Sequence, residues 1–334
     1  MTARTRRSGP RPQNPAGPGI PCRETTVTST GGARLHVEIH GPDDAPTVVL
    51  AHGWTCNTTF WYPVTRLLAE DHRVVLYDQR GHGRTPATPG SCGTEALADD
   101  LCAVLDAVLE PGQKAVVGGH SMGAMTIVAA APRDCLRERA VAAMLCSTGV
   151  SRLSVESRVI ALRGGKKRHH AHRLLLGSAL PFGPVTPLSK RLLRYVTMGP
   201  EATAEQRTEV ARIVHACARR PRAEWGKVLG RLDLLDRAAD LTVPSVVLYG
   251  TADRLTPPVH AHRLAGALPD TTLVELPRMG HMTPIEDTGT VADALRGLVR
   301  VHLKEGAPGA AGINGGESDS KVTPAGPREG STTA

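Results

Sequence analysis

Aromatic side chains are scarce in this chain of 334 residues, which has 2 Phe, 3 Trp and 4 Tyr. A core must therefore consist mainly of leucine, valine and alanine, and the hydrophobic content of 40% is sufficient for a large one. Proteins that stack nucleic acid bases need grouped aromatic residues, and the sequence contains neither such a group nor a recognised nucleic-acid-binding motif. We therefore expect no nucleic acid partner.

Long hydrophobic runs are also missing, because no stretch reaches the roughly 18 apolar residues that indicate a membrane-spanning helix. The first 23 residues are basic and lack the apolar segment of a secretory signal. We expect residues 1–23 to form a disordered basic tail. Residues 305–334 are dominated by Gly, Pro, Ser and Thr, and we expect disorder there as well.

The 7 cysteines are widely scattered and include no C-x-x-C pair, so the sequence indicates neither a zinc site nor a disulfide framework. Free thiols in a cytoplasmic protein are the expectation. The sequence also has no phosphate-binding loop and no motif of metal ligands. We expect neither a metal nor another cofactor.

Positive charge is concentrated in one part of the chain. The formal net charge is +8, and residues 151–240 contain 18 Lys or Arg against 8 Asp or Glu. Within this segment, residues 166–173 include His169, His170 and His172, which are too close in sequence to converge from one helix face. We interpret the basic segment as a solvated surface. Attraction of acidic substrates or of an anionic membrane surface is the alternative.

Short apolar or β-branched runs alternate with segments of helical periodicity in most of the chain. The runs predict strands over residues 24–28, 34–40, 47–51, 73–77, 115–119, 141–146, 245–249 and 272–276. The helical spacing predicts helices over residues 59–70, 94–109, 122–131 and 290–303. This alternation is typical of an α/β fold with a mostly parallel, doubly wound sheet.

The alternation stops between residues 148 and 241, where the spacing is helical throughout. Thr203 and Gln206 form a capping box that opens a helix. A later amphipathic stripe consists of Trp225, Val228, Leu229, Leu232 and Leu235. We expect residues 148–241 to be a helical cap inserted into a core made of residues 24–147 and 242–304.

The run Gly119-His120-Ser121-Met122-Gly123 lies where a strand pattern gives way to a helical one. A sharp strand-to-helix turn of this type exposes the serine hydroxyl in front of a helix N-terminus. A serine nucleophile needs a base and a carboxylate to orient it. Asp253 and His281 each follow a predicted strand, and parallel strands end at one edge of a sheet. We predict a triad of Ser121, His281 and Asp253.

The hydrolysis of an acyl group also requires donors for the developing oxyanion. The segment Ala51-His52-Gly53-Trp54 ends the predicted strand 47–51, so its loop can turn a backbone N–H toward the serine. We predict that the backbone amides of Trp54 and Met122 form the oxyanion hole.

Together these motifs resemble the α/β-hydrolase fold superfamily, in its serine esterase and peroxidase-like branch, over residues 24–303 apart from the cap. In this family the segment 77–84 is a structural loop, which implies that Asp78 and His82 lie outside the triad. Epoxide hydrolases and haloalkane dehalogenases of this fold use Asp where this chain has Ser121. The Gly-Gly-Gly oxyanion loop of certain lipases is also absent, since only Gly53 precedes Trp54.

The resemblance implies an eight-stranded α/β-hydrolase fold and a serine hydrolase that cleaves a small carboxylic ester with an apolar portion through an acyl-serine. The same triad would also suit hydrolysis of a C–C bond, thioester or lactone, or cofactor-free perhydrolysis of the haloperoxidase type. A ligand receptor without catalysis is a further alternative.

Overall fold

A single mixed sheet organises the chain in the computed structural model, which describes residues 19–88, 90–160 and 165–303. Its strands follow the order β1-β2-β4-β3-β5-β6-β7-β8. β1 pairs with β2 and β2 with β4 in antiparallel fashion, whereas every later pair is parallel. The strands are Cys22–Thr28, Arg34–His40, Thr47–Ala51, Arg73–Tyr77, Ala115–His120, Ala140–Cys146, Ser245–Gly250 and Thr271–Leu276 for β1 to β8. The eight-stranded, mostly parallel sheet predicted from the sequence is confirmed.

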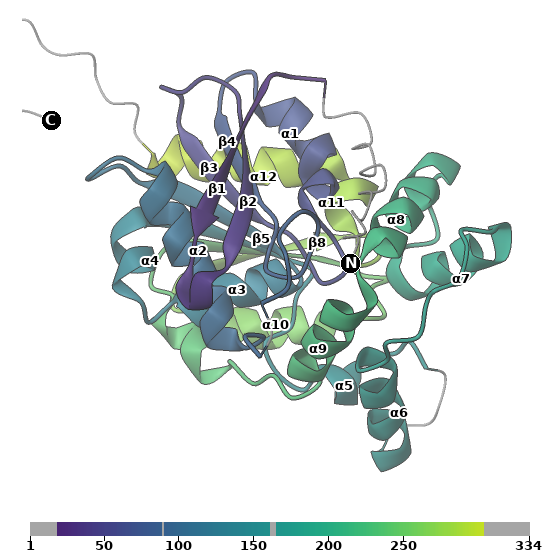
Figure 1. The fold of residues 1–334 in the computed structure, drawn as a ribbon. Helices are drawn as coiled ribbons and strands as arrows, with labels where there is room; N and C mark the ends of the chain where they lie inside the picture. Colours follow the sequence, from purple (N-terminus) through teal and green to yellow (C-terminus); the bar gives the residue numbers. More distant parts are fainter. Residues whose placement is uncertain (1–18, 89, 161–164, 304–334) are drawn as a thin grey trace, which may run out of the picture. The chain divides into compact units, whose positions relative to one another are not determined.

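Helices cover both faces of the sheet (Figure 1). On one face lie α2 (Thr94–Val108), α3 (Met122–Ala130) and α10 (Pro258–Ala267). The other face is covered by α1 (Tyr62–Leu68), α11 (Thr283–Glu286) and α12 (Thr288–His302). The side chains buried between sheet and helices are mainly Leu, Val and Ala, as the scarcity of aromatic residues predicted.

Several element boundaries differ from the predictions. β1 begins at Cys22, two residues before the predicted core. The predicted helix over 59–70 is split into a 3-10 turn, Thr58–Trp61, and α1, which has proline in its first turn, where the missing N–H breaks no helical hydrogen bond. The helices α4 (Asp134–Arg139), α10 and α11 were not predicted.

The expectation of free thiols is wrong for one pair. Cys102 on α2 and Cys135 on α4 form a disulfide, with their Cα atoms 5.5 Å apart. The two residues are 33 positions apart in sequence, and only the packing of α2 against α4 brings them together. The spacing of the cysteines in the sequence does not predict this contact.

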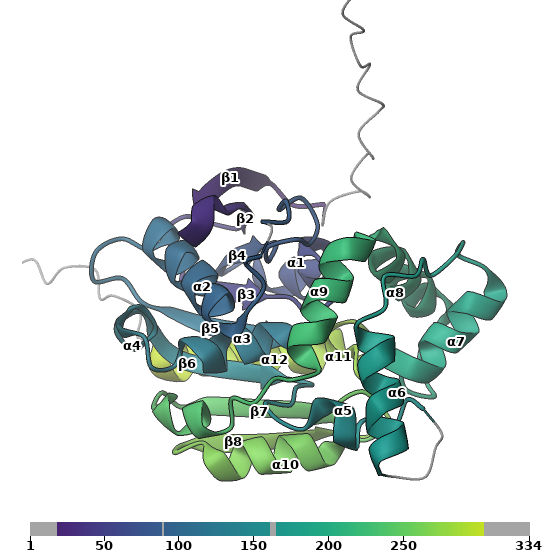
Figure 2. The ribbon, with the colours of Figure 1, turned by 60° about the horizontal axis from the view of Figure 1, so that its bottom comes forward.

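The residues between β6 and β7, 147–160 and 165–244, are here called the helical insertion (Figure 2). It contains α5 (Leu153–Glu156), α6 (Lys166–Leu176), α7 (Pro187–Thr197), α8 (Ala204–Ala216), α9 (Arg219–Leu229) and the 3-10 turn Asp236–Asp240. The predicted capping box at the start of α8 is confirmed. α9 ends at Leu229, so Leu232 and Leu235 of the predicted stripe lie beyond the helix.

The interpretation of residues 166–173 as solvated surface is correct for Lys166, Lys167 and His170 but wrong for His172. His172 is buried, its Nδ1 lies 3.0 Å from the carbonyl oxygen of Ser154, and its Nε2 accepts the N–H of Ile160 at 3.1 Å. The proton is therefore on Nδ1, and the side chain joins α6 to the segment around α5.

In the ranges that the structure describes, no helix is long and apolar enough to cross a bilayer. The predicted tails, residues 305–334 and residues 1–18 of the N-terminal one, lie outside those ranges.

Candidate active site

Ser121 lies in a strained turn between β5 and α3, with φ of 51° and ψ of −114°. Few residues other than glycine adopt positive φ, so the surrounding structure must hold this conformation. A Cβ atom at Gly119 would collide with the backbone at Ala124, and one at Gly123 would collide with the carbonyl of Ala51. The two glycines thus allow strand and helix to approach closely, as the sequence predicted.

His281 and Asp253 are brought together by the loops after β8 and β7. The His281 Nδ1 lies 2.8 Å from the Asp253 Oδ2. The other carboxylate oxygen accepts the backbone N–H groups of Leu255 and Thr256, at 2.8 and 2.9 Å. The Thr256 hydroxyl donates to Oδ2 at 2.8 Å. This buried carboxylate is therefore fixed in orientation and directs the Nδ1–H of the imidazole toward itself, which leaves Nε2 free.

The loop that carries His281 is held by a carboxylate that the sequence analysis missed. Glu286 accepts the backbone N–H of Gly280 at 3.0 Å and that of Met282 at 3.0 Å, on either side of His281. It also accepts the N–H of Gly199, from the helical insertion, at 2.6 Å. Burial raises the pKa of Glu286, because desolvation outweighs the three amide donors.

Two further contacts fix the same loop. The backbone N–H groups of His281 and Met282 both donate to the carbonyl of Thr197, at 2.8 and 3.2 Å. The Nε2 of His120 lies 2.7 Å from the His281 carbonyl oxygen. Burial lowers the pKa of His120 well below its ordinary value, so the ring is neutral and donates this bond from Nε2.

A second neutral histidine orients the loop after β3. The Nε2 of His52 accepts the backbone N–H of Gln79 at 3.0 Å, so its Nδ1 carries the proton and donates to the Gly53 carbonyl at 2.8 Å. Cys56 donates its N–H to the same carbonyl at 3.1 Å. Burial lowers the pKa of His52 to about 3. Because a peptide plane is rigid, fixing this carbonyl also fixes the opposite N–H, that of Trp54.

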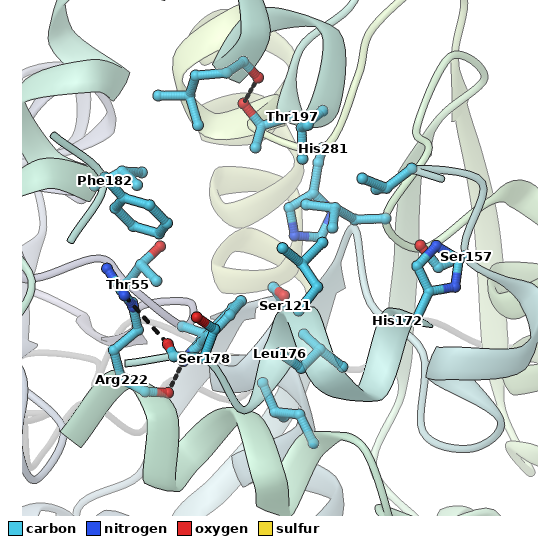
Figure 3. Close-up of a pocket in the computed structure, with 18 of the residues that line it drawn as sticks. Thr55, Ser121, Ser157, His172, Leu176, Ser178, Phe182, Thr197, Arg222 and His281 are labelled. Carbon is cyan, nitrogen blue, oxygen red and sulfur yellow. Dashed lines mark hydrogen bonds between the residues drawn. The ribbon is translucent and has the colours of Figure 1, made fainter. Parts of the chain in front are cut away.

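Ser121, His281 and Trp54 line one cavity of about 420 Å³, which is closed on one side by the helical insertion (Figure 3). Its walls are largely apolar and include Leu175, Leu176, Leu180, Leu192, Leu193, Val196 and Leu229. Within the described ranges, the amides of Trp54 and Met122 hydrogen-bond no other protein group. The geometry thus brings together a hydroxyl, an imidazole paired with a carboxylate, two free amides and an apolar cavity.

Asp78 and His82 are buried but do not line the cavity. Asp78 accepts the backbone N–H groups of Thr58 and Arg84, both at 2.8 Å, and burial raises its pKa to about 6. Asp78 therefore holds a loop, and that neither residue belongs to a triad stays a prediction.

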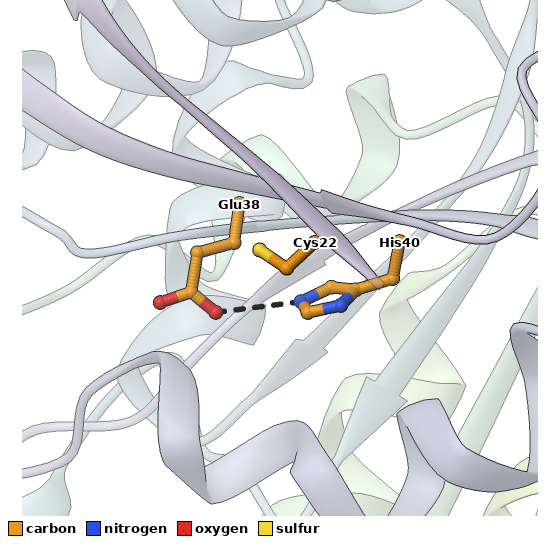
Figure 4. Close-up of side chains that lie close together, drawn as sticks. All are labelled: Cys22, Glu38 and His40. Carbon is orange, nitrogen blue, oxygen red and sulfur yellow. Dashed lines mark hydrogen bonds and ion pairs between the residues drawn. The ribbon is translucent and has the colours of Figure 1, made fainter. Parts of the chain in front are cut away.

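Side chains of metal-binding type do meet at a second place, on β1 and β2, where Cys22, Glu38 and His40 lie close together (Figure 4). The Glu38 carboxylate accepts the hydroxyls of Thr58 and Tyr62, at 2.8 and 3.1 Å. The Nε2 atoms of His36 and His40 contact it at 3.0 and 3.4 Å. These hydrogen bonds occupy the carboxylate, and a metal ion would have to displace these partners from it.

Comparison with known proteins agrees with this architecture. The chain matches the Alpha/beta hydrolase family over residues 48–294. The protein named "Putative carbamate hydrolase RutD" of Variovorax paradoxus (strain S110) is 30% identical over 284 residues, which cover 82% of this chain and 98% of that one.

Two solved structures share the fold. A thermophilic esterase from Thermogutta terrifontis superposes with a TM-score of 0.69 at 24% identity, covering 84% of this chain and 99% of its own. The enol-lactonase from Burkholderia xenovorans LB400 gives a TM-score of 0.66 at 24% identity, over 83% of this chain and 100% of its own. With a family match that spans most of the chain and the fold described above, this protein belongs to the alpha/beta hydrolase family.

Proposed function

We propose that this protein is a serine hydrolase that cleaves small carboxylic esters with an apolar portion, through an acyl-serine intermediate. The observation that carries the proposal is the strained turn that presents Ser121 to the cavity that His281 also lines, with Asp253 behind the imidazole. Positive φ at a buried serine is expensive to maintain, and such strain is typical of functional sites.

In the proposed mechanism the Nε2 of His281 removes the proton of the Ser121 hydroxyl as the oxygen attacks the ester carbonyl. Asp253 holds the imidazole by its Nδ1–H and stabilises the imidazolium that forms. The imidazolium then protonates the departing alcohol. Water, deprotonated by His281, attacks the acyl-serine and releases the acid together with the free serine.

The proposed oxyanion hole consists of the backbone N–H groups of Trp54 and Met122. The Trp54 amide is preoriented because His52 and Cys56 hold the Gly53 carbonyl on the other side of the same peptide. The Met122 amide begins α3, where the helix N-terminus favours negative charge. A fixed donor of this kind lowers the barrier by about 2.7–4 kcal/mol.

The apolar walls of the cavity support an ester with a hydrocarbon portion, since burying each CH₂ group contributes about 0.8 kcal/mol. The names of relatives widen the range of acyl substrates to test. They include the protein named "Putative carbamate hydrolase RutD" and, at 34% identity over 100 residues, 3-oxoadipate enol-lactonase 1 of Acinetobacter baylyi. A carbamate or a lactone could be attacked by the same hydroxyl.

Labelling with a fluorophosphonate, followed by turnover of p-nitrophenyl esters of increasing acyl length, tests the proposal. Ser121→Ala should abolish both, whereas Ser157→Ala, which removes another hydroxyl on the cavity wall, should still be labelled. Ester turnover that survives in Ser121→Ala would overturn the mechanism. Labelling without ester turnover would favour carbamate, lactone, thioester or C–C substrates, perhydrolysis, or a receptor.

A separate feature of the helical insertion supports a membrane partner. Of the eleven large hydrophobic side chains that are exposed in the described residues, eight lie between residues 174 and 195, and four of these do not line the cavity: Leu174, Val185, Leu188 and Tyr195. Exposed cations occur in or next to this stretch of sequence at Lys166, Lys167, Arg173 and Arg191. An apolar surface bordered by cations fits an anionic lipid surface, whereas like charges oppose the stacking of two copies. We propose that this face contacts anionic membranes; the cytoplasmic location expected from the sequence stays a prediction.

Sedimentation with vesicles tests this partner. The protein should bind vesicles that contain phosphatidylglycerol more strongly than vesicles of phosphatidylcholine alone. Leu188→Glu should reduce binding. Val301→Glu is the control and should not reduce it, because Val301 is also well exposed, at 61% against 77% for Leu188, but lies outside the insertion. Equal binding by both variants, or a dimer that Leu188→Glu disrupts in the absence of lipid, would contradict the proposal.

A further inference from the structure

The substrate cavity contains one cation that the proposed mechanism does not use. Arg222 on α9 lines the cavity and is only 3% exposed. Among the described residues that line the cavity, it is the one Lys or Arg, and no Asp or Glu occurs. A buried charge on the wall of a largely apolar cavity is costly unless a partner compensates for it.

The partners that Arg222 has among the described residues are all neutral. Its Nη2 donates to the backbone carbonyls of Ser178, at 3.2 Å, and Leu180. The guanidinium lies over the ring of Phe182, with its Cζ 3.8 Å from the ring centre. Burial lowers the pKa of Arg222, which reflects desolvation of the cation, but an arginine stays charged at neutral pH. These contacts position the guanidinium without neutralising it.

The remaining donors of Arg222 are available to a ligand. Nε and Nη1 hydrogen-bond no described residue, yet neither atom is among the fully buried unpaired atoms of the structure. Both therefore retain some accessible surface on a residue that lines the cavity. Figure 3 shows the side chain entering from α9 beside Thr55 and Phe182, on the same cavity that Ser121 and His281 line.

We infer that Arg222 binds a carboxylate at the far end of the substrate, so that the preferred substrates are esters or lactones that carry a free carboxylate across a hydrocarbon spacer. This inference rests on the proposed function, because it places the reacting carbonyl at Ser121. With Nη2 engaged by the two carbonyls, Nε or Nη1 can donate to a carboxylate, and such a charge-assisted hydrogen bond is stronger than one to a neutral acceptor. The apolar walls between Arg222 and Ser121 then accommodate the spacer.

Half-esters of dicarboxylic acids test the inference directly. The mono-p-nitrophenyl esters of glutaric, adipic, pimelic and suberic acid are compared with the same esters whose far carboxyl group is methylated. Hydrolysis of each releases p-nitrophenolate, so one assay covers both series. For the spacer that spans the site, we expect a KM roughly 10- to 100-fold lower for the free carboxylate, as for a hydrogen-bonded charge pair.

Two arginines on the same helix provide the variant and its control. Arg222→Gln should bring the ratio of the two KM values toward one, and Arg222→Lys should retain part of the preference. Arg220→Gln removes the same charge from an exposed position of α9 and should keep the full preference. Equal KM values for both ester series in the unmodified protein would overturn the inference and leave the proposed function intact.

A purely structural role for Arg222 predicts a different result. If Arg222 only holds residues 178–182, Arg222→Gln should impair both ester series equally and leave their KM ratio unchanged, which would refute the inference. If no ester of either series is cleaved, the proposed function fails instead. Calorimetric titration of the adipic and suberic half-esters into Ser121→Ala, with and without Arg222→Gln, then decides carboxylate binding independently of turnover.

Discussion

Replacing Glu286 tests how the loop of His281 is held. The carboxylate accepts three backbone N–H groups, from Gly199, Gly280 and Met282. In Glu286→Gln the side chain keeps its shape. Its single carbonyl oxygen replaces only one of the two carboxylate oxygens, so at least one backbone N–H is left facing the NH₂ group. The variant removes a hydrogen bond to a charged group, which contributes about 1.5–3 kcal/mol, and leaves an unpaired donor.

The raised pKa of Glu286 moderates this estimate. Desolvation of the carboxylate already offsets part of what its hydrogen bonds contribute, so we expect the free energy of unfolding to fall by about 1 kcal/mol in Glu286→Gln. Glu286→Ala loses all three bonds and should lose about 3 kcal/mol or more. Since Gly280 and Met282 flank His281, kcat should fall in both variants, by more than KM changes.

Urea denaturation and p-nitrophenyl ester kinetics measure the two effects. Asp287→Asn is the matched control, because it removes the adjacent carboxylate, which caps α12, and asparagine is an equally good cap. A Glu286→Gln variant that matches the unmodified protein in both stability and kcat would refute the idea that this carboxylate holds the loop of His281.

Three further predictions concern the surroundings of the site. Gly123→Ala places a methyl group against the Ala51 carbonyl, so circular dichroism and labelling should reveal a misfolded or inactive turn; normal labelling would contradict this. In His52→Asn the side-chain amide can still donate to the Gly53 carbonyl from the position of Nδ1, whereas in His52→Gln it cannot. The kcat should therefore fall further in His52→Gln, and equal kcat values would exclude orientation of the peptide by this bond. Burial alone would raise the pKa of Glu38. Its hydrogen bonds, above all the one with His36, instead hold this pKa well below the ordinary value. Its contribution to stability is thus present above about pH 4.5 and lost at lower pH, and the deficit of Glu38→Gln in thermal unfolding should shrink as the pH falls through that range.

The sheet and the turn at Ser121 were predictable because their signals are local. Alternating apolar runs define the strands, and the glycines around Ser121 record a close approach of two backbones that only glycine permits. Asp253 and His281 were also found, since each follows a strand and parallel strands share an edge. Their assignment to a triad remains a proposal that the labelling experiment tests.

The features that the sequence did not reveal depend on tertiary packing. Arg222 and His172 belong to a segment whose many cations suggested a solvated face, and only the folded insertion turns these two side chains inward. Glu286 follows His281 by five residues without a motif, and its role arises when the insertion brings Gly199 to it. The bond between Cys102 and Cys135 likewise requires two helices to meet.

The contacts of Thr197 and Gly199 with the loop of His281 bear on protein engineering. Exchanging the insertion between relatives is an obvious route to new substrate ranges, but here its α7–α8 junction is part of the support for the loop of His281. A chimaera whose donor segment lacks a matching carbonyl and amide at these two positions would inherit a new cavity and a misplaced histidine. Grafts that end before residue 197 would change the cavity wall and leave that support in place.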